Sequence, residues 1–281
     1  MSEDFSFKKL PKLVSADPSQ SSVVPQSGME QGASRLIKDE ADHTFHEIEN
    51  HSAGQMLCVR LLKGVINVSD VVRTRVRRFG VFYGDTFASY GMPIEKIAKE
   101  TSSDERRADE EILRIIFKDP DKGAKYGPEN NNIKIDSSGK AAYFDFEFFA
   151  AFFMYPRIRN REDRFVKRLL ELGFDNGLRE LDRKPSVIYV ELSRLSRQAL
   201  DILIDKLRRL KKAYEDDNGQ FVRDVIISLP VPLREAIYFP EDLLQKSDVE
   251  LANEFLALLT HRVDEMLDIA ITVRNERNLT K

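Results

Sequence analysis

The stretch 130–147, which reads NNNIKIDSSGKAAYFDFE, decides the predicted fold of this chain. Residues 133–135 read Ile-Lys-Ile and residues 141–144 read Ala-Ala-Tyr-Phe, and each segment has the length of a short strand. Between them lie turn-forming residues, and Gly139 among these can adopt the positive φ that a tight loop often needs. The stretch therefore predicts two strands joined as a β-hairpin.

Downstream of this stretch the pattern becomes helical. Apolar residues recur at spacings of three and four over 161–172, 195–214 and 249–273. In the last segment six of them share one face: Ala252, Phe255, Leu259, Val263, Met266 and Ala270. Ser247 and Glu250 have the spacing of a capping box, so we expect this helix to begin at about that point.

Upstream, two further helices are predicted. The first covers about 42–62, after a short apolar piece at Leu36-Ile37. The second follows residues 102–105, where Ser102 could bond the amide of Glu105. Its apolar stripe is Ala108, Ile112, Ile115 and Ile116, and Asp119-Pro120 marks its end.

Composition excludes several classes of protein. The 281 residues carry 44 Lys and Arg against 47 Asp and Glu, so no general positive field would attract the chain to nucleic acid. No apolar run approaches the ~20 residues of a membrane-spanning helix. Cys58 is the only cysteine, which excludes an internal disulfide and makes a reducing compartment the natural one. Residues 1–4 are acidic and no secretory signal follows, so we expect a cytoplasmic protein without a membrane span.

The stretch 123–147 resembles the catalytic core of the protein-kinase-like superfamily, including its aminoglycoside- and choline-phosphotransferase branches. In that family an asparagine and the aspartate of an Asp-Phe-Gly motif flank a hairpin, and Asn132 and Asp145 occupy these places here. The resemblance implies that Asp145 and Asn132 bind Mg²⁺, which prefers oxygen ligands. It also implies ATP as the nucleotide.

Other family positions match less closely. Residues 35–38 resemble the strand that carries the phosphate-binding lysine, which would make Lys38 a nucleotide ligand. Glu47, or alternatively Glu49, lies on the predicted following helix, where the family glutamate pairs with that lysine. Gly127 stands where the family has its catalytic aspartate, and glycine cannot accept a proton, so the catalytic residue is unknown.

The resemblance and the patterns together give one predicted architecture. Residues 1–30 form a flexible leader, rich in Ser, Gln and Pro toward its end. Residues 31–281 form a single α+β, mostly helical domain with a reduced kinase-like core around the central β-hairpin. Its reduced N-terminal lobe covers 31–100 and its helical C-terminal lobe covers 101–281.

Two functions are compatible with these features. One is a degenerate, pseudokinase-like protein that binds Mg-ATP or retains ATP-dependent phosphotransferase activity. The alternative is a helical protein–protein interaction module without catalysis, which would bind a protein partner or form a homo-oligomer through its C-terminal helices. The basic run 206–212 is expected to form a charged outer helix face, and Cys58 to be a buried small hydrophobe.

Overall fold

The computed structural model describes residues 34–38, 44–48, 57–58, 60–62, 64–68, 71–75, 80–83, 103–119, 133–135, 141–143, 183–228 and 245–279. For the strands 34–38, 44–48, 71–75, 80–83 and 133–135, and for residues 141 and 142, only the backbone is described. The predicted leader 1–30 and the predicted helix 161–172 lie outside these residues.

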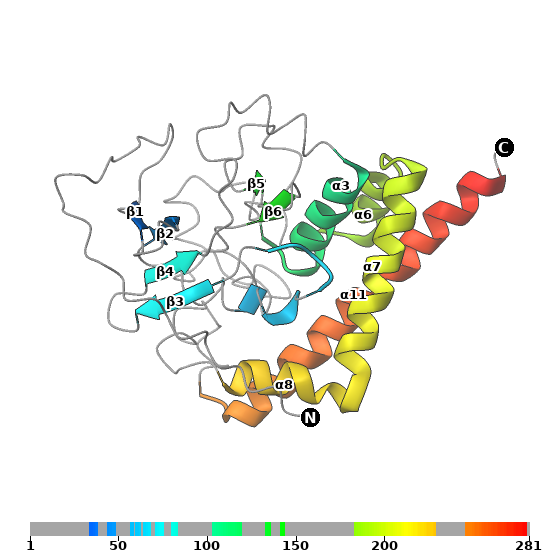
Figure 1. The fold of residues 1–281 in the computed structure, drawn as a ribbon. Coiled ribbons are helices and arrows are strands. Elements are labelled where there is room, and N and C mark those ends of the chain that lie inside the picture. The colour runs from blue at the N-terminus through cyan, green and yellow to red at the C-terminus, as the bar shows by residue number, and fades with distance from the viewer. Residues whose placement is uncertain are drawn as a thin grey trace, which may run out of the picture.

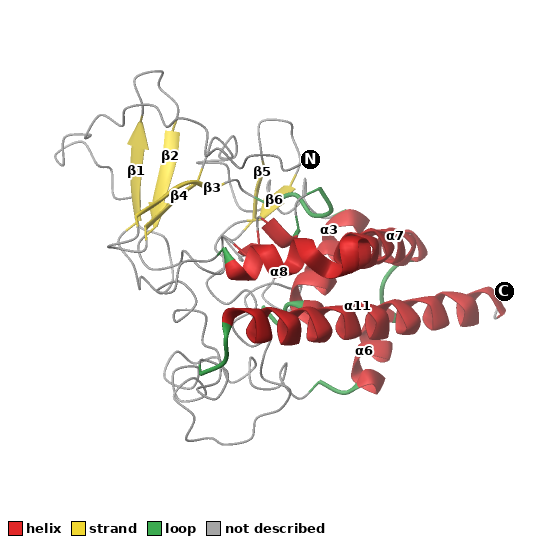
Figure 2. Cartoon of the chain, turned by 90° about the horizontal axis from the view of Figure 1, so that it is seen from below, coloured by secondary structure: helices red, strands yellow, loops and turns green. Residues whose placement is uncertain are grey.

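Most of the described residues lie in helices (Figure 1). They are α3 (Asp104–Glu111), which continues into the π-helical turn η2 (Ile112–Ile116), then α6 (Pro185–Leu192), α7 (Arg197–Glu215) and α8 (Gln220–Ile227). The short 3₁₀ segment η4 (Asp216–Gly219) joins α7 to α8, and α11 (Asp248–Leu279) is the longest helix described. Figure 2 shows α11 running the length of this assembly, with α7 and α8 on one side and α6 on the other.

One hydrophobic cluster joins all of these helices. The apolar faces of α7 and α11 supply many of its members, among them Leu203, Leu207 and Leu210 of α7. All six residues of the predicted stripe on α11 are buried, which confirms that face. The stripe predicted on the helix before Pro120 is buried as well, because α3 and η2 pack against α7 and α11.

Strands lie in two antiparallel sheets. The larger has the order β1-β2-β4-β3, formed by Ser34–Lys38, Thr44–Ile48, Gly80–Tyr83 and Val71–Arg75. The smaller pairs β5 (Ile133–Ile135) with β6 (Ala141–Tyr143), with Ile133 opposite Tyr143. In both ribbon views the larger sheet lies to one side of the helices (Figures 1 and 2).

The predicted fold class, an α+β kinase-like core organised around a central β-hairpin, is wrong. Of the residues whose side chains are described, 81% are helical, and the core that they form is built from helices. The smaller sheet supplies Tyr143 to this core, whereas the helices supply nearly all of the rest. Alternating residues indicate extended segments, but they do not show whether those segments form the centre of a domain or lie beside a helical bundle.

Two local predictions need correction. The predicted helix over 42–62 is wrong at 44–48, which form strand β2. Within this range, Leu57 is the first described residue that is helical. The hydroxyl of Ser103, not Ser102, caps α3 by accepting a hydrogen bond from the Arg106 amide at 3.1 Å. By contrast, the capping box of α11 is confirmed: the Glu250 amide donates to Ser247, and the Ser247 amide donates to the Glu250 carboxylate.

Within the described residues, no helix is both long and apolar enough to cross a bilayer.

Candidate functional site

Of the sequence-predicted ligands, the structure describes Lys38 and Glu47, and for these it describes the backbone alone. Lys38 is the last residue of β1 and pairs with Thr44, whereas Glu47 lies on β2 and pairs with Arg35. Glu47 is therefore on a strand and not on the helix that the family resemblance requires. Asn132 and Asp145, the predicted Mg²⁺ ligands, lie outside the described residues, as does Gly127.

The part of the chain that the structure describes holds no cluster of three or more His, Cys, Asp or Glu side chains that could bind a metal ion.

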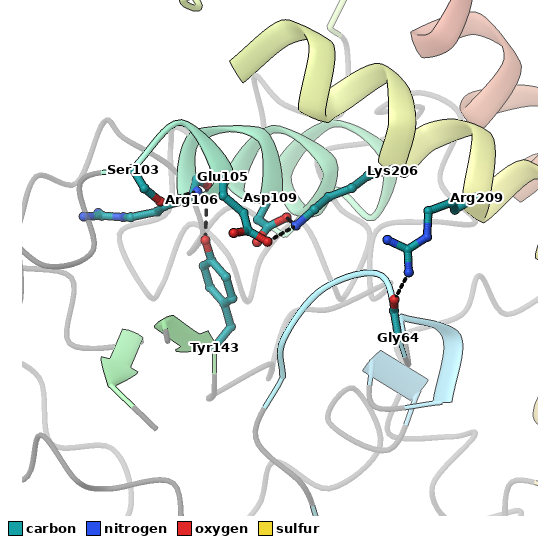
Figure 3. A network of polar contacts seen from close by, with 8 residues as sticks. All are labelled: Gly64, Ser103, Glu105, Arg106, Asp109, Tyr143, Lys206 and Arg209. Atoms are coloured by element: carbon teal, nitrogen blue, oxygen red, sulfur yellow. Dashed lines mark hydrogen bonds and ion pairs between the residues drawn. The ribbon is translucent and has the colours of Figure 1, made fainter. Parts of the chain in front are cut away.

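The structure instead reveals a network of charged side chains between α3 and α7 (Figure 3). The Lys206 ammonium on α7 lies 2.6 Å from the Asp109 carboxylate and 3.1 Å from that of Glu105, both on α3. Lys206 and Asp109 are almost completely buried, while the side chain of Glu105 is mostly exposed. Removing one partner of such a buried pair would leave the other charge buried without compensation, which strongly destabilises the folded state.

Tyr143 links this network to the sheet residues. Its backbone amide donates to the Asn67 carbonyl at 3.0 Å, and its hydroxyl donates to the Arg106 carbonyl of α3 at 3.2 Å. Burial, together with the nearby Asp109 carboxylate, holds the pKa of the Tyr143 phenol well above its usual value. The hydroxyl therefore remains a neutral hydrogen-bond donor at physiological pH.

The sequence analysis did not identify the pair of Lys206 and Asp109, although the spacing of Lys206 contains a signal for its burial. Lys206 follows Leu203 by three residues and precedes Leu210 by four, so helical spacing places it on the apolar stripe of α7. The expectation that 206–212 form a charged outer face is wrong for Lys206. It is confirmed for Arg208, Arg209 and Lys212, which are exposed, and the Arg209 guanidinium donates to the Gly64 carbonyl (Figure 3).

A second feature is the outward face of α6. Ile188 and Leu192 are buried against the helical core, whereas Val187 and Val190 are 45% and 49% exposed. Lys184, just before the helix, and Arg194, just after it, are exposed too. Val187 and Val190 are one helical turn apart, and we call these two residues together with Lys184 and Arg194 the α6 stripe.

The rest of α6 is firmly attached to its neighbours. Glu191 accepts from Arg183 at 2.6 Å and from Arg114 of η2 at 3.1 Å. On α11, Glu276 accepts a hydrogen bond from the Tyr189 hydroxyl, and Arg277 donates to the Leu195 carbonyl at 2.6 Å. These contacts position α6 independently of its two exposed valines.

Comparisons with known proteins identify no relative: no protein-family model, curated protein or solved structure matches the chain.

Proposed function

We propose that this chain is a helical protein–protein interaction module, and that it binds its partner through the α6 stripe. The observation that carries the proposal is that α6 is apolar on both of its faces. A helix that is apolar all round is normally covered on all sides. Val187 and Val190 instead face solvent, one turn apart, which is the arrangement by which a helix face docks onto another protein.

The charges at the two ends of the stripe define the chemistry of the partner. Lys184 and Arg194 are both exposed and bracket the two valines. A complementary surface would place apolar side chains opposite Val187 and Val190 and carboxylates opposite the two cations. We therefore assign as the partner a protein segment with apolar residues flanked by Asp or Glu.

The first experiment places a photo-crosslinking amino acid at Val187 in the full chain expressed in cells. The expected product is an adduct whose crosslinked partner peptide, identified by mass spectrometry, has apolar residues flanked by acidic ones. Introducing Val190→Asp should abolish the adduct, because a carboxylate opposes both the apolar contact and the acidic flanks. A crosslinker at exposed Gln198 of α7 is the matched control and should not yield this adduct.

Two outcomes would overturn the proposal. A crosslink that maps only to another segment of this same chain would show that α6 has an internal cover. An adduct that survives Val190→Asp would show that the stripe does not bind the partner.

Nucleotide binding is tested separately. The interaction module is expected to melt at the same temperature with and without Mg-ATP, because a ligand raises the melting temperature only if it binds the native state. A rise that disappears in Asp145→Ala would favour the phosphotransferase expectation instead.

A further inference from the structure

Besides α6, helix α8 also presents apolar side chains to solvent. Phe221 and Ile227 are 36% and 38% exposed, whereas Val222 and Ile226 are buried in the core. Asp224 is exposed too and lies three residues from each of the two exposed apolar residues, so it is their neighbour on the helix surface. We call Phe221, Asp224 and Ile227 the α8 stripe.

The surroundings of the α6 and α8 stripes carry opposite charges. Within 183–198 the exposed charged residues are all basic: Lys184, Arg194 and Arg197. Within 215–228 they are all acidic: Glu215, Asp216, Asp217 and Asp224. Arg223, the one cation of this second range, is directed at α11, where it donates to Asn253 at 2.6 Å. The α8 stripe therefore has the chemistry assigned above to the partner of α6, namely apolar residues flanked by acids.

Within one molecule, α7 separates the two stripes. Helix α6 ends shortly before α7 begins, and α8 follows the end of α7 after the short segment η4. The 19 residues of α7 span about 28 Å at 1.5 Å per residue. Figure 1 shows α6 and α8 near opposite ends of α7. An α6 stripe can therefore meet an α8 stripe only on another molecule.

We propose that the partner of the α6 stripe is the α8 stripe of a second copy of this chain, so that copies associate head to tail. The inference rests on the proposed function and names its partner. Because the contact joins two different surfaces, every pair still has one α6 stripe and one α8 stripe unoccupied, and further copies can add to it. Two exposed apolar residues on each side suit a weak association that increases with protein concentration.

Analytical ultracentrifugation of the purified full-length protein tests this inference. The wild-type mass should rise with concentration and exceed that of two chains. Val190→Asp on α6 and Phe221→Asp on α8 should each reduce it to the mass of one chain, because each places a charge in the apolar contact. An equimolar mixture of the two variants should form pairs and nothing larger, since the intact α6 stripe of one variant can bind the intact α8 stripe of the other.

Arg208→Asp, at an exposed residue of α7 between the two stripes, is the matched control and should keep the wild-type mass. Should Phe221→Asp fail to fold, as judged by circular dichroism, the double variant Asp217→Lys with Asp224→Lys replaces it, because both carboxylates are exposed. This variant reverses the charges that face Lys184 and Arg194.

Three results would overturn the inference: a wild-type protein that keeps the mass of one chain up to about 0.5 mM, single variants that keep the wild-type mass, or a mixture of variants that does not associate. The crosslinker at Val187 separates this failure from failure of the proposed function. An adduct with a different protein retains the proposed function and rejects only the second copy as partner. An adduct with residues 215–228 that has the mass of two chains supports both, whereas a crosslink within a single chain contradicts both.

Discussion

Gly64 and Gly219 have nearly the same left-handed backbone, with φ of +78° and +77°, but different surroundings. A methyl group at Gly64 would meet no atom within 4 Å, whereas one at Gly219 would collide with the Leu256 side chain of α11. We expect Gly64→Ala to lower the free energy of unfolding by about 1 kcal/mol, the cost of the left-handed conformation. Gly219→Ala should cost more, because Leu256 must move as well.

Urea denaturation of both variants measures this difference. Leu256→Ala provides the internal control, since it removes the colliding atoms. In the Leu256→Ala background the extra cost of Gly219→Ala over Gly64→Ala should disappear. If Gly219→Ala still costs more than Gly64→Ala in that background, the collision with Leu256 is not the cause.

The hydroxyl of Tyr214 is expected to stabilise the attachment of residues 57–62 to α7. It is buried and donates to the Leu61 carbonyl at 3.0 Å. Tyr214→Phe leaves that carbonyl without this donor, so thermal unfolding should show a loss of about 1–2 kcal/mol. Tyr189→Phe removes an exposed hydroxyl that bonds Glu276, so it should lower the melting temperature by less than Tyr214→Phe does. Equal effects in the two variants would contradict this assignment.

At the scale of single elements, two adjacent serines at the start of α3 are expected to differ in their contribution to stability. Ser103 accepts the Arg106 amide, so Ser103→Ala should lower the free energy of unfolding by about 1 kcal/mol. Ser102→Ala, at the position that the sequence pattern favoured as the cap, should have little effect. Chemical denaturation of the two variants decides between them, and a larger loss in Ser102→Ala would restore the predicted cap.

Elements differed in how well their sequence predicted them. The start and the buried face of α11 were predictable, because a capping box and the apolar spacing of a helix are local signals. The β2 strand Thr44–Ile48 was not predictable in the same way. It pairs with β1, which lies just before it, and on its other edge with β4, which lies much later in the chain, and such pairing overrides local helical spacing.

At the scale of the whole molecule, α11 is the helix against which α6, α7 and α8 pack. Phe255 is fully buried in this arrangement, so Phe255→Ala should cost about 3–5 kcal/mol through the cavity that it leaves. Val249, on the same helix but 56% exposed, is the matched control, and Val249→Ala should change stability by less than about 0.5 kcal/mol. Calorimetry on both variants checks the difference, and a small effect at Phe255 would show that α11 is not central to the core.

By itself the sequence determined the helical segments around Ala108, Leu203 and Phe255, because cap residues and apolar spacing act within a few turns of one chain segment. Tertiary structure alone decided that Lys206 meets Asp109, and that the valines of α6 remain outside the core while Ile188 and Leu192 are enclosed. These outcomes depend on which helices become neighbours. Burial and charge pairing are properties of two surfaces in contact, and they are not encoded in the spacing of either surface alone.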